Sequence, residues 1–209
     1  MKKIFSAILI CVLILLFTAC SSSKDTGKAP VAGDPSKVEG AQYVEQPGEE
    51  SNVTAEVGEE EVYIYIPSDF ILSTVQSISD DAKSKGAKDV KVYSDSSVSY
   101  TMSRSDYDKM MEENRTAFED NIKDMTKQDS VYKNITYNED YSEFKFYVDS
   151  EAYKNRSVDL VKDQLYAGSR MYQIYMCKDP ESIKYTYEVI DSETNEVIES
   201  ATFPDDLTY

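Results

Sequence analysis

The spacing of apolar and polar residues divides this chain into three parts. An apolar run occupies residues 4–17, and a polar stretch with scattered apolar residues follows up to about residue 60. Beyond residue 60, segments with the alternating pattern of strands are interleaved with segments that repeat every three to four residues, as helices do. The pattern therefore predicts a leader at 1–19, a polar segment at 20–60 and one folded domain at 61–209.

Within the domain, the pattern predicts one strand followed by three units, each made of a helix and a strand pair. The first strand, 62–66, is rich in β-formers and ends at Pro67. The predicted helices span 68–86, about 103–125 and 150–178, and the predicted strand pairs are 90–93 with 98–102, 131–137 with 143–148, and 183–190 with 197–203. The units share no residue-level identity, so both a duplication and a simple alternation are open.

Two of the predicted helices carry more specific signals. Ser103-x-x-Asp106 and Ser105-x-x-Asp108 can each form a capping box at the start of the second helix. In the third helix, the run of small residues Ala167-Gly168-Ser169 predicts the close approach of a neighbouring element.

Alternation within the strands separates an apolar face from a face that bears tyrosines. The apolar side chains are Val62, Ile64, Ile66, Val90, Val92, Val98, Tyr100, Met102, Phe144, Phe146 and Val148. The opposite face carries Tyr63, Tyr65, Tyr93 and Tyr147. This indicates an α+β fold in which an antiparallel sheet of about seven strands has three helices packed on one face. The four tyrosines form a possible binding face, although their high strand propensity is the simpler explanation.

The composition removes several classes of chemistry. The chain has no histidine, which excludes Ser-His-Asp and Cys-His catalysis and zinc sites that need histidine. Its formal net charge is −17, so its surface should repel nucleic acid. Residues 191–196 have alternating oxygen ligands but lack the glycine of a calcium loop, and we interpret them as a hairpin turn. We therefore predict no metal, no cofactor and no catalytic residue.

The leader has the layout of a secretory signal. Lys2 and Lys3 precede an apolar core of about 14 residues, which is too short to span a bilayer as a helix. Phe17-Thr18-Ala19-Cys20 resembles the bacterial lipobox, which implies cleavage between Ala19 and Cys20 and lipid attachment to Cys20. An ordinary secretory signal, in which Cys20 is incidental, is the alternative. The polar segment 20–60 is then interpreted as a disordered acidic tether.

Five segments of the domain carry a resemblance to known proteins: 87–90, 97–103, 134–144, 148–153 and 203–207. On these segments the chain resembles a group of uncharacterised lipoproteins from Gram-positive, clostridia-like bacteria, some of which carry a label taken from an antigen I/II N-terminal region. The group has no assigned activity. The resemblance therefore implies the location and the fold and adds no catalytic residue.

These patterns together predict a lipid-anchored protein on the extracytoplasmic face of the cell membrane. Its domain is expected to bind or scaffold an unknown protein or envelope component without catalysis. A carboxylate-dependent hydrolase and a small solute-binding accessory lipoprotein are the two alternatives. The second is disfavoured because two-lobed solute-binding proteins usually exceed one domain of about 150 residues.

Overall fold

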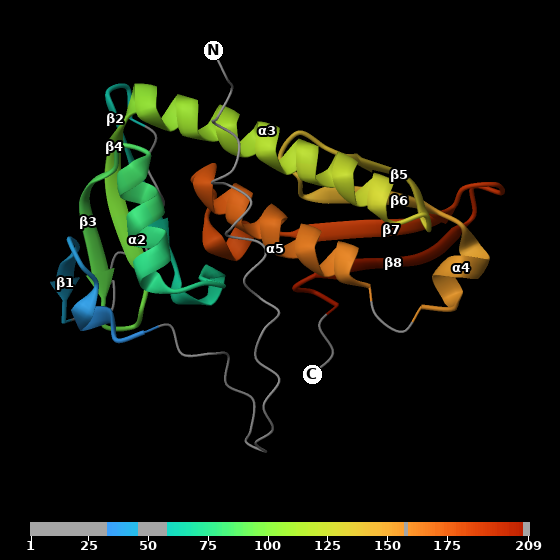
Figure 1. Cartoon of the computed structure of the whole chain (residues 1–209), viewed down its shortest axis with the longest axis horizontal. Coiled ribbons are helices and arrows are strands. Elements are labelled where there is room, and N and C mark those ends of the chain that lie inside the picture. Colours follow the sequence, from blue (N-terminus) through green and yellow to red (C-terminus); the bar gives the residue numbers. More distant parts are fainter. Residues whose placement is uncertain (1–32, 46–57, 157–158, 207–209) are drawn as a thin grey trace, which may run out of the picture. The chain divides into compact units, whose positions relative to one another are not determined.

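A computed structural model describes residues 33–45, 58–156 and 159–206 of the chain (Figure 1). These residues form two four-stranded mixed sheets and three helices of at least seven residues. The predicted α+β class is confirmed. The prediction of one antiparallel sheet of about seven strands is wrong, because the strands divide between two sheets and each sheet contains a parallel pair. Ala19 and Cys20 lie outside the described residues.

The first sheet has the strand order β1-β3-β4-β2. Its strands are β1 (Gln42–Val44), β2 (Glu61–Ile66), β3 (Lys88–Tyr93) and β4 (Val98–Ser103). β1 pairs parallel with β3, while β4 pairs antiparallel with both β3 and β2.

The described part of the predicted tether belongs to this first sheet. Residues 33–45 contain the 3-10 helix η1 (Pro35–Lys37) and the strand β1. The segment is also tied to the helix that follows β2, because Lys83 Nζ donates to the Glu39 carbonyl over 2.6 Å. The prediction of disorder is therefore wrong for residues 35–37 and 42–44. β1 forms through pairing with β3 and shows almost no apolar pattern of its own.

The second sheet has the strand order β5-β6-β7-β8. Its strands are β5 (Tyr132–Tyr137), β6 (Glu143–Val148), β7 (Tyr185–Asp191) and β8 (Val197–Phe203). The outer pairs are antiparallel and β6 runs parallel to β7. The predicted second and third strand pairs therefore join each other, while the first lies in the other sheet.

The bounds of the helices differ from the predicted bounds at positions where a capping residue starts a helix. They are η3 (Ser68–Phe70), α2 (Val75–Ser84), α3 (Arg104–Gln128), α4 (Ser150–Lys154), α5 (Leu160–Tyr175) and η4 (Pro180–Ser182). Ser68 starts only a 3-10 turn, and Thr74 caps α2 instead. The predicted third helix is two helices, because Asp159 accepts a bond from the Lys162 amide and starts α5 anew. For α3, Ser103 is the N-cap: its hydroxyl accepts from the Asp106 amide and donates to the Asp106 carboxylate, which is one half of the first predicted capping box.

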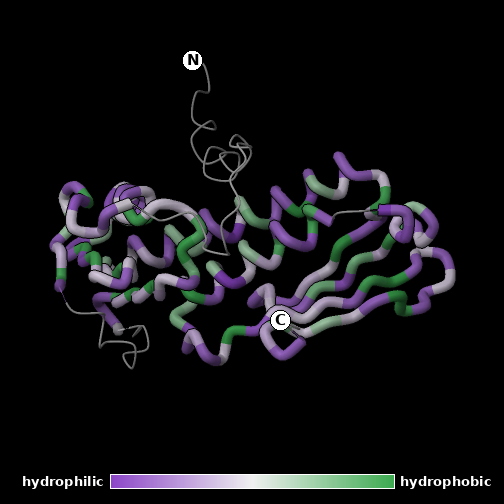
Figure 2. The backbone as a smooth tube through the Cα atoms, turned by 90° about the horizontal axis from the view of Figure 1, so that it is seen from below, coloured by the Kyte–Doolittle hydropathy of each residue, from purple (hydrophilic) through white to green (hydrophobic). Residues whose placement is uncertain are grey.

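Each sheet has its own hydrophobic core, and α3 and α5 contribute to both. The first core takes Tyr107 and Met110 from α3 and Ile174 from α5, and the second takes Ile122 from α3 and Leu165 from α5. The side chains predicted to face inward are buried, as the alternating hydropathy along the strands suggests (Figure 2). In Figure 1, α3 and α5 lie beside each other, in agreement with their contacts.

The predicted close approach at Ala167-Gly168-Ser169 is confirmed. A Cβ atom on Gly168 would lie only 2.5 Å from Cε2 of Phe118 in α3. The Phe118 ring packs edge-to-face on Tyr141 with ring centres 4.8 Å apart, so it has little room to move. Ser169 is fully buried and its hydroxyl donates to the Tyr141 carbonyl. Glycine is therefore required here for packing between two helices.

We predict that Gly168→Ala lowers the free energy of unfolding by about 1–3 kcal/mol, because the added methyl overpacks the α3–α5 contact. In an unhindered helix interior the same change would stabilise by about 0.5–1 kcal/mol. Urea denaturation measures the difference. The control is the same substitution in a Phe118→Leu background, where the destabilisation should shrink or reverse. An equal loss in both backgrounds would show that Phe118 is not the obstacle.

Candidate functional site

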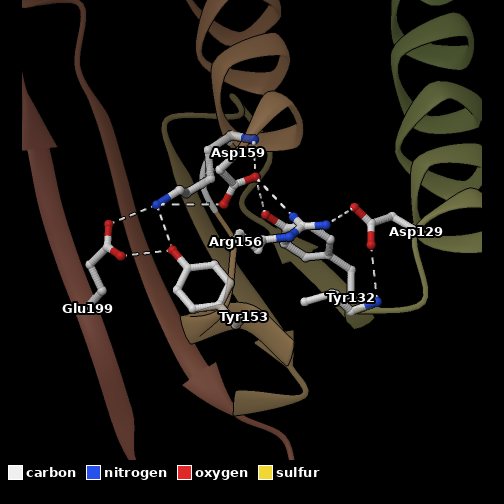
Figure 3. Close-up of polar contacts among 8 residues, drawn as sticks. Asp129, Tyr132, Tyr153, Arg156, Asp159 and Glu199 are labelled. Atoms are coloured by element: carbon white, nitrogen blue, oxygen red, sulfur yellow. Dashed lines mark hydrogen bonds and ion pairs between the residues drawn. The ribbon is translucent and has the colours of Figure 1, made fainter. Parts of the chain in front are cut away.

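A cluster of charged residues and tyrosines joins the start of α5 to strands β5 and β8 (Figure 3). We name it the α5–β8 cluster, and its members are Asp129, Tyr132, Tyr153, Arg156, Asp159, Lys162, Tyr187 and Glu199. It contains three carboxylates and two cations, and its tyrosines come from α4 and two strands. Among the described residues it is the richest candidate for a functional site.

One half of the cluster is centred on Glu199. The Lys162 ammonium lies 2.8 Å from Glu199 Oε1 and donates to the Tyr153 hydroxyl over 2.7 Å. The Tyr153 hydroxyl in turn donates to Glu199 Oε2 over 2.8 Å, and the Tyr187 hydroxyl donates to the same carboxylate. Lys162 also lies over the Tyr187 ring, 4.7 Å from its centre. Three donors therefore hold one carboxylate.

The other half is centred on Arg156, in the break between α4 and α5. Its guanidinium lies over the Tyr132 ring, 5.2 Å from the centre, and pairs with Asp129 at the end of α3. It also reaches Asp159 Oδ1 at 3.5 Å. Asp159 additionally accepts a bond from the Tyr132 hydroxyl and lies 3.7 Å from Lys162 Nζ. Asp159 thus caps α5 and connects the two halves.

The pKa values of Glu199, Lys162 and the three tyrosines of this cluster are shifted in directions that keep each group in its ordinary protonation state at neutral pH. Burial, assisted by Glu199, raises the pKa of Tyr187 to about 12, and burial also raises the pKa values of Tyr132 and Tyr153. For Glu199, burial acts to raise the pKa, but the bonds from Lys162 and the tyrosines outweigh it and leave the pKa lowered. For Lys162, burial acts to lower the pKa, but its anionic and tyrosine neighbours leave it raised.

This arrangement is better suited to holding secondary-structure elements together than to transferring protons. A general base or acid works best with a pKa near the operating pH, whereas the pKa values of Glu199, Lys162 and the three tyrosines are shifted away from neutrality. Lys162 and Asp159 each keep only 15% of their side-chain surface exposed, and both have charged partners. The cluster therefore fastens the N-terminal end of α5 to β8, to α4 and to the end of α3.

The predicted tyrosine face is divided by the structure. Tyr63, Tyr65 and Tyr93 belong to the first sheet and Tyr147 belongs to the second. Tyr65 and Tyr93 are only 7% and 4% exposed and pack edge-to-face, with ring centres 6.2 Å apart. Tyr63 and Tyr147 are half-buried. The prediction that all four tyrosines share a single open face is therefore wrong, because they lie on two sheets and two of them are buried.

An open depression lies beside Tyr63 on the β2–β4 pair. Its volume is about 540 Å³, and it is lined by Gly58, Glu60, Glu61, Tyr63, Thr101 and Ser103. Two of its lining residues are carboxylates. Within the described ranges, however, no group of three or more acidic or cysteine side chains is arranged to hold a metal ion. Cys177, the cysteine in these ranges, is half-buried, and burial raises its pKa to about 11, so the thiol stays protonated.

The chain matches no family model, and comparison with curated proteins and with solved structures yields no match either. The described helices include none that is long and apolar enough to cross a bilayer. The resemblance to Gram-positive lipoproteins stays a prediction.

The sequence alone did not lead to the α5–β8 cluster. The sequence predicts one continuous helix across Arg156 and Asp159. In the structure the helix is interrupted there, and this interruption brings the two side chains together. Two signals were present: Asp159 stands three residues before Lys162 in N-cap spacing, and Glu199 occupies an inward position of β8 between apolar neighbours. A glutamate on the inward side of a strand requires a buried partner.

We predict that Glu199→Gln lowers the free energy of unfolding at pH 7 by about 1 kcal/mol, since it weakens an ion pair and two hydrogen bonds that are partly exposed. Because the folded-state pKa of Glu199 is lowered, its stabilisation is fully present above its ordinary pKa of 4.5 and is lost as the pH falls through the lowered value. The difference between wild type and variant should therefore shrink as the pH falls below 4.5. Urea denaturation from pH 7 to pH 3 measures it.

The matched control is Glu196→Gln, which removes an exposed carboxylate from the turn before β8. This variant should match wild type within about 0.5 kcal/mol across the same pH range. If both variants lose the same stability, net charge is responsible and the cluster is not the cause.

Proposed function

We propose that this chain is a lipid-anchored protein of the extracytoplasmic membrane face, whose domain binds or scaffolds an envelope component without catalysis. The observation that carries the anchor is the junction Phe17-Thr18-Ala19-Cys20, placed directly after an apolar core too short to span a bilayer. Each buried lipid methylene contributes about 0.8 kcal/mol, so more than one acyl chain at Cys20 would hold the protein firmly.

The proposal of a binding role agrees with the pKa directions of four carboxyls in the described ranges. A carboxylate-dependent hydrolase needs one carboxyl whose pKa is raised, so that it can donate a proton near neutral pH. In the described ranges, the carboxyls with shifted pKa values are Asp34, Asp140, Asp191 and Glu199, and all four pKa values are lowered. These groups are tuned to stay ionised. A binding or scaffolding role does not require proton transfer.

We predict that Cys20→Ala moves the protein from the membrane fraction to the soluble extracytoplasmic fraction, because the thiol that carries the lipid is lost. Cell fractionation followed by immunoblotting measures the distribution. The control is Cys177→Ala, which removes the other cysteine of the mature chain and should leave the protein in the membrane fraction. Retention of the Cys20→Ala protein in the membrane would refute the anchor.

The same strains test the binding role. A membrane-impermeant cross-linker applied to intact cells should give discrete adducts with the anchored wild-type chain, and these adducts should be lost or reduced for Cys20→Ala. If the anchored chain gives no adduct across a range of cross-linker lengths, the scaffolding role is refuted even when the anchor holds.

A further inference from the structure

Arg170 in α5 lies between two aromatic rings that belong to different cores. Its guanidinium carbon is 4.2 Å from the centre of the Phe70 ring and 5.2 Å from the centre of the Tyr166 ring. Phe70, in η3, packs against the first core, and Tyr166, one turn before Arg170 in α5, packs against the second. In such cation–π contacts the flat faces of the guanidinium contact the rings, and the N–H groups at its edge stay available for hydrogen bonds.

The edge of this guanidinium is without a partner in the part of the chain that the structure describes. No hydrogen bond or ion pair joins Arg170 to any residue in the described ranges, whereas the other arginines there, Arg104, Arg115 and Arg156, each pair with a carboxylate. The chain has 39 acidic residues against 22 basic ones, so carboxylates are abundant. An arginine that is positioned by rings but left without an anion is therefore the exception in this protein.

The geometry fits one class of ligand. The guanidinium carries five N–H donors in its plane, and two of them match the two oxygens of a carboxylate. A single positive charge balances a monoanion, while a phosphate dianion normally collects several cations or backbone donors. The net charge of −17 also repels multivalent anions most strongly.

The two rings that hold Arg170 belong to a larger aromatic surface. Tyr166 packs on Phe203, which is partly exposed, with ring centres 5.4 Å apart. A ligand whose carboxylate reached Arg170 would therefore place its remaining atoms next to aromatic side chains.

From these observations we infer that Arg170, held between Phe70 and Tyr166, binds the carboxylate of a ligand that carries an apolar group. This inference deepens the proposed binding role and rests on it, but it does not depend on the lipid anchor.

The test is a titration of the full chain in detergent with 4-methylpentanoate, followed by NMR of the Arg170 Nε–Hε signal in ¹⁵N-labelled protein. The signal should shift saturably with 4-methylpentanoate. The uncharged 4-methylpentanamide, which partitions into micelles similarly, should not shift it, and inorganic phosphate should bind at least several-fold more weakly. The matched control variant is Arg115→Gln, which removes a cation elsewhere and should leave the Arg170 shift unchanged.

Two variants separate the site from the fold. Arg170→Gln should abolish the saturable shifts that 4-methylpentanoate causes in neighbouring backbone amides, and Arg170→Lys, which keeps the charge but loses the planar fork, should weaken binding several-fold. No saturable shift in wild type, equal binding of phosphate, or unchanged binding by Arg170→Lys would each overturn the inference. None of these results would alter the fractionation or cross-linking of the anchored chain, so failure at this site is distinguishable from failure of the proposed function.

Discussion

The packing of α3 against α5 is the contact on which both hydrophobic cores depend. Each core has one four-stranded sheet, and the apolar face of such a sheet is stabilised when helices pack against it. α3 supplies Met110 to the first core and Ile122 to the second, and α5 supplies Leu165 to the second and Ile174 to the first. The two helices can serve both cores only if they lie close together, and the absence of a side chain at Gly168 permits this.

This arrangement also explains where the chemically interesting groups lie. The start of α5 is fastened by the α5–β8 cluster, in which Asp159 caps the helix and Lys162 reaches Glu199. Arg170 lies further along the same helix, next to a ring from each core. Exposed ion pairs along α3, such as Arg115 with Glu119, contribute only a few tenths of a kcal/mol each. The position of α5 therefore depends on packing and on the cluster.

Much of the secondary structure could be predicted because it follows from local patterns. Alternation gave the bounds of β6 and β8, and Ser103 with Asp106 marked the start of α3. The division into two sheets could not be predicted, since alternation shows which side of a strand is buried but not which strand it pairs with. β1 was not predicted because a strand of three residues is too short to show a periodic pattern.

The candidate sites were less predictable than the fold. Tyr65 and Tyr93 alternate as outward residues should, yet both are buried. Phe70 and Arg170 are separated by 100 positions, and no local pattern relates them. Lys162 and Glu199 meet only because α5 restarts at Asp159 and packs over β8. Each site therefore depends on tertiary contacts between segments that are distant in the sequence.

The central claim is that the α3–α5 contact makes the two cores a single cooperative unit. Native-state hydrogen exchange tests it most directly, by comparing the opening free energies of the Ile64 amide in β2 and the Phe146 amide in β6 before and after Phe118→Ala. Phe118 packs against the second core alone. The claim predicts that both amides share one opening free energy and that the substitution lowers both equally. A decrease confined to Phe146 would show that the cores unfold independently and would contradict it.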